Sequence, residues 1–364
     1  MKYLIYFTFS FVILVSCSKN DVNLEKIYAY RTIIVYMAAD NDLSDDAWNN
    51  LKEIQNGYED MGANLIVFID PINDVPHILK IANEGNKRIK DYSEFNSVDA
   101  NQMRQVISDI IGLYPSESYG LVLWSHGTSW LPEGMQLKSF GDDQGRQMDI
   151  IDLANALPIK FDFILLDACL MGSIEVVYEL RNRAEYIIAS PTEILYLGFP
   201  YEPIIPELLK VEPDLKQVAN IYFSFFNQLS GAFNSASISL INTRELERLA
   251  MLTKQIITCR IFQTQTFDYS SVQRLDVYEK PYTFDFLDFM QKAFTEKETE
   301  QLIEQLNNTV LYKAHTSEFL SLYTIESFCG LSCYIPDHDE SLHYYYRNLN
   351  WYKDSGFDQL FSQK

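Results

Sequence analysis

The chain has 364 residues, of which 47% are hydrophobic and 22% are charged, and its formal net charge is −21. This composition is that of a globular protein with enough apolar material for a large core. The acidity argues against nucleic acid as a partner, because binding to backbone phosphates needs a basic patch and the sequence shows none.

Residues 1–17 have the pattern of a bacterial lipoprotein signal peptide. Lys2 precedes an apolar run that ends in Leu14-Val15-Ser16-Cys17. The run has the length of a signal-peptide core and is short for a membrane-spanning helix. Its last four residues resemble a lipobox, which implies that Cys17 is lipidated and becomes the mature N-terminus. An ordinary secretory signal or an N-terminal anchor helix is the alternative.

Residues 18–29 begin with a polar stretch and would tether the protein to this anchor. A lipidated Cys17 predicts a location in the bacterial cell envelope, with the protein held at the outer membrane through its lipid. Both the periplasmic face and the cell surface stay open.

Residues 30–190 alternate between apolar strands and helices. Strands are expected at 32–40, 63–70, 119–125, 161–166 and 184–190, and a weaker hairpin at 77–81 and 87–92. Helices are expected from the cap at 41–44 to about 58, at 101–113 and at 174–182. This order predicts an α/β fold with an open, mostly parallel sheet that is flanked by helices.

The chain after residue 190 is more helical. Helices are expected at 202–229, 243–259, 286–294 and 296–312, and strands at 235–241 and 330–336, the second returning to the sheet. No linker rich in Gly, Ser or Pro separates the halves. The prediction is therefore a catalytic core over 30–230, a C-terminal, helix-rich portion over 231–364, and a monomer.

Two of the predicted strands end in side chains that can do chemistry. The strand at 119–125 runs into His126-Gly127, and the strand at 161–166 runs into Asp167-Ala168-Cys169. Ligand sites of open α/β sheets lie beyond the carboxyl ends of their strands, so His126 and Cys169 are expected to be neighbours. Gly127 leaves room for a substrate backbone. The N–H groups of Gly127 and Cys169 are candidate oxyanion donors, as acyl transfer requires.

Each of these residues also has an ordinary structural interpretation. Cys169 alone is more often a buried thiol, and His126 alone a hydrogen-bonded histidine at a strand end. Their occurrence at matching ends of two strands favours catalysis. Cys169 is predicted to begin a strand-to-helix turn, in which the N-terminus of the following helix favours the thiolate and lowers the pKa of the thiol. Asp167 is expected on the same side as Cys169, either as a structural carboxylate or as the base of a cationic pocket.

The other cysteines and the histidines suggest no further site. Cys259, Cys329 and Cys333 are expected to be buried free thiols, because Cys329 and Cys333 lie too far apart along an extended strand to form a disulfide. The histidines other than His126 show no paired ligand spacing, so no metal ligand is assigned.

The segments LVLWSHGTSW and FILLDACLMGSIEVVYEL resemble the two active-site segments of the clostripain family, which are secreted cysteine peptidases of the caspase-like clan. TIIVYMAADNDL, GLSCYIP and LNWYKDSGFDQLF resemble other segments of the family. The resemblance implies a caspase-like fold in which Cys169 is the nucleophile and His126 the general acid of a Cys–His dyad. It also implies a peptide or protein as substrate.

Further properties follow from the resemblance alone. Asp167 matches the acid that helps to bind a basic P1 side chain, which implies cleavage after Arg or Lys. Relatives can depend on calcium, for which Asp40–Asp46 and Asp142-Asp143 are candidates, although solvated caps and loops are the simpler interpretation. Relatives can also be activated by self-cleavage in a loop between the His and Cys strands or beyond. The basic residues available between these two strands are Lys138, Arg146 and Lys160.

One departure from the family pattern affects specificity. Relatives with a basic P1 preference commonly carry a second acid before a Gly-Trp-x-Tyr stretch, whereas here Leu197 precedes Gly198 and the nearest carboxylate is Glu193. A different P1 preference is therefore an alternative. A catalytically silent lipoprotein that binds peptides or glycans, and another thiol enzyme such as an acyltransferase or amidase, also stay open.

Overall fold

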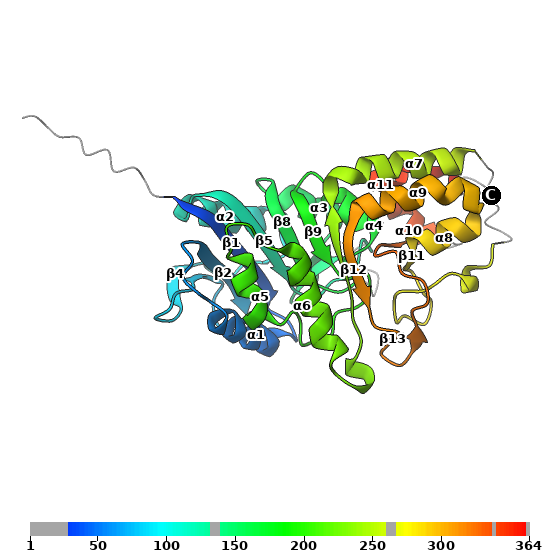
Figure 1. Cartoon of the computed structure of the whole chain (residues 1–364). Helices are drawn as coiled ribbons and strands as arrows, with labels where there is room; N and C mark the ends of the chain where they lie inside the picture. The colour runs from blue at the N-terminus through cyan, green and yellow to red at the C-terminus, as the bar shows by residue number, and fades with distance from the viewer. Residues whose placement is uncertain (1–27, 132–138, 260–266, 337–339, 362–364) are drawn as a thin grey trace, which may run out of the picture.

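A computed structural model describes residues 28–131, 139–259, 267–336 and 340–361 (Figure 1). Its centre is a nine-stranded sheet of order β12-β10-β9-β8-β5-β1-β2-β3-β4. The five central strands run parallel, namely β1 (Ala29–Ala39), β2 (Asn64–Pro71), β5 (Ser116–Trp124), β8 (Phe161–Asp167) and β9 (Ala184–Ala189). The antiparallel edge strands are β3 (His77–Lys80), β4 (Lys87–Asp91), β10 (Ser237–Asn242) and β12 (Val310–His315).

Helices cover both faces of this sheet (Figure 1). One face packs against α1 (Ser44–Asn56), α5 (Tyr201–Leu208) and α6 (Leu215–Asn227), and the other against α2 (Ala100–Leu113), α3 (Ile150–Ala156) and α4 (Ile174–Glu179). Strand β1 is buried on both faces. Ile33, Val35 and Met37 belong to one core cluster, while Ile34 and Tyr36 belong to the other. The predicted open, mostly parallel sheet is confirmed.

The C-terminal helices extend the core cluster that contains Ile34 and Tyr36 beyond the sheet (Figure 1). They are α7 (Leu246–Thr258), α8 (Phe286–Ala293), α9 (Glu296–Thr309), α10 (Glu340–Tyr346), α11 (Asn350–Asp354) and α12 (Phe357–Phe361). Three small two-stranded sheets lie outside the main one: β6 (Phe140–Asp143) with β7 (Arg146–Met148), β11 (Phe284–Asp285) with β15 (Ser332–Cys333), and β13 (Glu318–Phe319) with β14 (Tyr323–Thr324).

Two predictions for the C-terminal portion were wrong. The late strand at 330–336 does not return to the main sheet, because only Ser332–Cys333 is a strand and it pairs with β11. The helix predicted to run to residue 312 ends at Thr309, and the chain continues as the edge strand β12. The backbone hydrogen-bonding groups of β12 are satisfied by pairing with β10. The apolar pattern of this segment alone does not distinguish such a strand from the end of a helix.

The cysteine prediction was largely correct. Cys169, Cys259, Cys329 and Cys333 are all free, and Cys329 and Cys333 are buried, but Cys259 is exposed. The signal peptide with Cys17, and most of the tether, lie outside the described residues. Within the described ranges, no helix is both long and apolar enough to span a bilayer.

A buried carboxyl group at the end of β2 should make stability depend on pH. Both oxygens of Asp70 are buried. Burial, with smaller effects from the carboxylates of Asp143 and Glu94, raises the pKa of Asp70 to about 8, although a hydrogen bond from Ser97 opposes this shift. The stability contribution of this group is therefore fully present below the unfolded pKa of about 4 and is lost as pH rises toward 8.

Replacing Asp70 with Asn removes this titration and should stabilise the fold at high pH. We expect Asp70→Asn to raise the free energy of unfolding by about 2–4 kcal/mol at pH 8 and by much less at pH 4.5. Urea unfolding at both pH values measures the difference. The exposed Asp45→Asn is the matched control, and an equal gain at both pH values would contradict the prediction.

Candidate active site

The site lies where β5 and β8 end side by side. Trp124 pairs with Asp167 in the parallel register, and the N–H of Ser125 donates to the carbonyl of Asp167 at 3.3 Å. The residues that follow, His126 and Cys169, line one cavity of about 230 Å³. The other lining residues are Leu43, Trp124, Ser125, Asp167, Ala168, Ile194, Leu195, Tyr196 and Gly198. The structure therefore brings together the predicted residues His126, Cys169 and Asp167.

Cys169 sits in a tight turn that directly follows β8. The next residue, Leu170, has φ of +63°, a conformation that residues other than glycine rarely adopt, and its N–H donates to the carbonyl of Thr192. The Sγ atom of Cys169 accepts from the N–H of Ile194 at 3.2 Å and lies 3.4 Å from its carbonyl oxygen. The turn therefore holds the thiol against the segment that contains Ile194.

The predicted lowering of the Cys169 pKa by a helix N-terminus was wrong. Helix α4 begins at Ile174 with Ser173 as its N-cap, so its first turn does not include the thiol. Burial raises the pKa of Cys169 to about 12, and the carboxylates of Glu193 and Asp167 add to this effect. The thiol is therefore protonated at neutral pH in this arrangement.

Gly127 allows the two strand ends to approach each other. A Cβ atom at this position would lie 2.7 Å from the carbonyl oxygen of Cys169 and 2.8 Å from the Cβ of Ala168. Among the described residues, the N–H groups of Gly127 and Cys169 donate to no carbonyl oxygen. No backbone carbonyl therefore occupies either N–H group, which the predicted oxyanion role requires, and that role stays a prediction.

Adding a methyl group at Gly127 should separate these strand ends. We expect Gly127→Ala to destabilise the fold by about 1–3 kcal/mol, because backbone atoms must shift, and to lower activity about tenfold, because the reacting groups move apart. Thermal unfolding and peptide hydrolysis measure the two effects. Gly112→Ala is the control, since nothing lies within 4 Å of its added Cβ. A fully active Gly127→Ala protein would show that this spacing is not needed.

Asp167 is the only carboxylate among the described residues that line the cavity. Its Oδ2 accepts from the hydroxyl of Tyr201 at 2.7 Å and from the N–H of Phe199 at 3.2 Å. Burial raises the pKa of Asp167 to about 6, although both hydrogen bonds oppose this shift. Gly198 lies over the carboxylate, and a Cβ there would be 3.1 Å from Oδ2. Asp167 is thus an oriented acid that is largely ionised at neutral pH.

The nearest other acid, Glu193, does not line this cavity. Its Oε1 accepts from the N–H of Val277 at 2.9 Å, and burial raises the pKa of Glu193 to about 7. Leu197 is also absent from the lining. The described residues therefore supply one carboxylate for a basic side chain.

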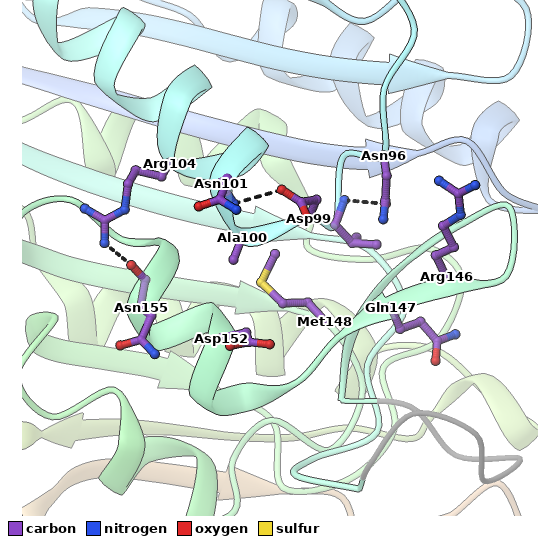
Figure 2. Close-up of a pocket in the computed structure, with 11 residues that line it drawn as sticks. Asn96, Asp99, Ala100, Asn101, Arg104, Arg146, Gln147, Met148, Asp152 and Asn155 are labelled. Atoms are coloured by element: carbon purple, nitrogen blue, oxygen red, sulfur yellow. Dashed lines mark hydrogen bonds between the residues drawn. The ribbon is translucent and has the colours of Figure 1, made fainter.

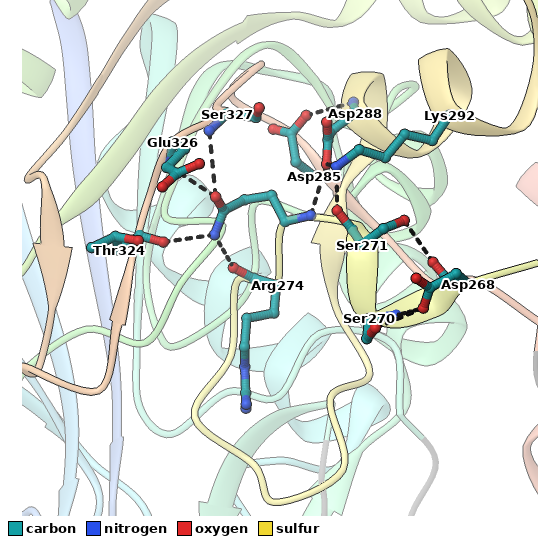
Figure 3. Close-up of polar contacts among 11 residues, drawn as sticks. Asp268, Ser270, Ser271, Arg274, Asp285, Asp288, Lys292, Thr324, Glu326 and Ser327 are labelled. Atoms are coloured by element: carbon teal, nitrogen blue, oxygen red, sulfur yellow. Dashed lines mark hydrogen bonds and ion pairs between the residues drawn. The ribbon is translucent and has the colours of Figure 1, made fainter.

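A polar network holds the segment that contacts Glu193. The side chain of Gln273 donates to the carbonyl oxygens of Arg274 and Thr324 at 3.0 and 2.9 Å and accepts from the N–H of Glu326 at 2.8 Å. Figure 3 shows how the residues around it link segment 268–274 to segment 324–327 and to α8. Asp276, just before Val277, is fully buried. The network therefore fixes the chain beside Glu193.

A larger hollow, of about 570 Å³, lies between the starts of α2 and α3 and the β6–β7 hairpin (Figure 2). Arg104 donates there to the carbonyl of Asn155. Its lining contains no cysteine or histidine. This hollow therefore does not provide a nucleophile, despite its size.

The acidic residues considered for calcium are engaged within the protein. Asp40 accepts from the side chain of Gln144, Asp142 from the N–H of Gly145, and Asp143 from Ser97. In the described part of the chain, no group of three or more His, Cys, Asp or Glu residues is arranged to hold a metal ion.

The fold and the site together define the class of this protein. After β1 the chain adds β2, β3 and β4 on one side of the sheet, and it then adds β5, β8 and β9 on the other side. The cavity lies beyond the carboxyl ends of β5 and β8, next to the point where this order reverses. A cysteine and a histidine at the ends of adjacent parallel strands define a caspase-like α/β protein of the cysteine-peptidase type.

The family follows from a direct match. The model of the clostripain family matches residues 35–364, and the chain belongs to this family. Clostripain from Hathewaya histolytica is 24% identical over 220 residues, which cover 49% of this chain and 42% of that protein. The chain thus spans less than half of the length of this relative.

Two solved structures are similar over nearly their whole lengths. An inactive zymogen of a C11 protease from Parabacteroides distasonis is 31% identical, with a TM-score of 0.79, and covers 90% of this chain and 98% of its own. A secreted C11 cysteine protease from Bacteroides thetaiotaomicron, solved with an irreversible peptide inhibitor, is 33% identical, with a TM-score of 0.81, and covers 91% and 100%.

Sequence reasoning missed the other partners of the site. The contact of Asp42 with His126, of Ile194 with the thiol, and of Val277 with Glu193 all join residues far apart in the chain. Asp42 lies in a stretch that the sequence suggested for helix capping or calcium. The available signal for this contact was that Asp42 directly follows the strand β1, at the same sheet edge as His126.

Proposed function

We propose that this protein is a lipid-anchored cysteine endopeptidase that cleaves after Arg or Lys. The observation that carries the proposal is the single cavity that holds Cys169, His126 and Asp167. Family membership and the inhibitor-bound relative support a peptide as substrate.

The proposed reaction is acyl transfer through a thioester. As the sulphur of Cys169 attacks the peptide carbonyl, its proton passes to the imidazole of His126, and the N–H groups of Gly127 and Cys169 stabilise the oxyanion. The carbon–nitrogen bond then breaks, and His126 donates a proton to the departing amine. Water hydrolyses the thioester, which restores the thiol. Asp167 binds the basic P1 side chain by charge pairing.

The resting site suggests how the enzyme is held inactive. The thiol is protonated and contacts the backbone of Ile194 on both its N–H and its carbonyl. We propose that cleavage at a basic residue between the His126 and Cys169 strands precedes activity. Arg146 is exposed in the β6–β7 hairpin, whereas Lys160 lies 2.7 Å from Glu185 in an ion pair. Lys138 lies outside the described residues.

Hydrolysis of a mixed fluorogenic peptide library by the purified protein tests this function. The assay is run before and after mild proteolytic nicking, and with and without calcium. Cleavage after Arg or Lys is expected. Cleavage after other residues would remove the P1 assignment only. Binding of peptides without cleavage, in nicked and intact protein alike, would favour the silent binding lipoprotein.

Attachment to the membrane needs its own test, since residues 1–27 are outside the described ranges. Incorporation of labelled fatty acid into the wild-type protein, and its loss in Cys17→Ala, would support lipidation of Cys17. A secreted, unlabelled wild-type protein would contradict the anchor and leave the peptidase proposal unaffected.

A further inference from the structure

Asp42 makes a contact with His126 that the proposed dyad does not require. Its Oδ1 lies 2.7 Å from Nε2 of the imidazole. The side chain of Asp42 is 84% exposed and that of His126 37% exposed, so packing does not hold the two groups together. The loop that carries Asp42 must therefore set the distance.

This loop is braced on both sides of Asp42. The amide of Asn41 donates to the carbonyl oxygens of Ala38 and Asp142 at 3.0 and 2.7 Å. Its side-chain oxygen accepts from the N–H of Leu43 at 2.8 Å. The loop is thus tied to the end of β1 and to the β6–β7 hairpin.

The same hairpin holds the histidine. The N–H of Gly141 donates to the carbonyl of His126 at 2.9 Å, and the N–H of Asp142 donates to the hydroxyl of Ser125 at 3.2 Å. The hairpin therefore contacts the segments on which both members of the Asp42–His126 pair stand. The backbone around Asp42 and His126 therefore sets the distance between the two side chains.

From this arrangement we propose that Asp42 is a positioning residue for proton donation to the leaving amine. The inference rests on the proposed peptidase function. The carboxylate accepts the hydrogen of Nε2, which fixes the orientation of the ring and leaves Nδ1 as the nitrogen free to exchange a proton. The proton on Nδ1 passes to the amine nitrogen as its bond to the carbonyl carbon breaks. The imidazole is then neutral and takes a proton from the water that attacks the thioester.

This role predicts a dependence on the leaving group. An amine must be protonated as it leaves, because its anion is too basic, whereas a thiolate leaves without a proton. Loss of Asp42 should therefore slow acylation by an amide substrate and have little effect on acylation by a thioester with the same acyl group. A residue that only supports the fold would affect both substrates equally.

The test compares kcat/KM, which reports the steps through acylation, for a Lys peptide amide and the corresponding thiobenzyl ester. Asp42→Asn should lower the value for the amide about 10- to 100-fold, within the range of general acid catalysis, and that for the thioester by less than about threefold. Asp42→Glu, which keeps the carboxylate, should recover part of the loss. Asp45→Asn, an exposed acid in the first turn of α1, is the matched control and should leave both values unchanged.

The variant is expected to fold, because exposed ion pairs contribute little to stability, and thermal unfolding verifies this. An equal loss on both substrates, or no loss on either, would overturn the positioning role while leaving the peptidase function intact. A wild-type protein that hydrolyses neither substrate and no member of the mixed peptide library, even after nicking, would overturn the proposed function and this inference with it. These outcomes are distinguishable in one set of assays.

Discussion

Cys169→Ala should abolish peptide hydrolysis while leaving the fold intact. The loss is expected to exceed about 10,000-fold in kcat, because without the sulphur no covalent acyl-enzyme can form. Cys169 is only half-buried by its surroundings, and it makes two contacts with the backbone of Ile194. Their removal should change the free energy of unfolding by about 1 kcal/mol or less.

Cys169→Ser separates the chemical role of the sulphur from its structural role. The hydroxyl can make the same hydrogen bonds to Ile194 but is a much weaker nucleophile at neutral pH. We expect this variant to unfold like the wild type and to be as inactive as Cys169→Ala. Cys259→Ala is the control, because Cys259 is an exposed free thiol at the end of α7. Hydrolysis that persists in both Cys169 variants would show that another group is the nucleophile.

The sequence predicted the parts of the site that depend on strand ends. Because β1, β5 and β8 are buried on both faces, they appear as continuous apolar runs, and their carboxyl ends could be located to within one or two residues. Parallel order then placed His126 and Cys169 at the same edge. The structure places both residues at that edge, where they line one cavity with Asp167.

What the sequence did not predict depends on contacts between distant segments. The turn that separates Cys169 from α4 is held by backbone hydrogen bonds from Leu170 and Gly172 to Thr192 and Ser190. No local sequence pattern indicates such hydrogen bonds. The same holds for the raised pKa of Cys169, which comes from burial beneath a segment 25 residues later in the chain.

Asp167→Asn should remove cleavage after Arg and Lys. The proposed ion pair between Asp167 and a basic P1 side chain would form in a cavity with no other carboxylate among the described residues, so nothing would compensate for its loss. Removing one partner of a desolvated pair costs about 3–4 kcal/mol, which corresponds to a decrease of about 100- to 1,000-fold in kcat/KM. Peptides that differ only at P1, with Lys, Arg, Gln or Leu, measure this decrease.

The variant is close to isosteric, and its amide oxygen can still accept from Tyr201 and Phe199, as Oδ2 of Asp167 does. We therefore expect cleavage of the neutral Gln and Leu peptides, where it occurs, to change little. Asp162→Asn on the same strand is the control, since Asp162 pairs with Arg31 and does not line the cavity. Equal losses on charged and neutral peptides would place the role of Asp167 in folding or catalysis and not in P1 binding.

The pH dependence gives a second, independent measurement of the same assignment. Because burial raises the pKa of Asp167 to about 6, the empty pocket loses its negative charge as pH falls through that value. The kcat/KM for Lys peptides should therefore decrease below about pH 6 relative to the kcat/KM for neutral peptides. In the enzyme–substrate complex the positive P1 side chain stabilises the ionised carboxylate, so the decrease in kcat should occur at a lower pH. In Asp167→Asn the ratio of the two substrates should be independent of pH, because the group that titrates is absent. A ratio that still changes near pH 6 in this variant would assign the titration to another residue.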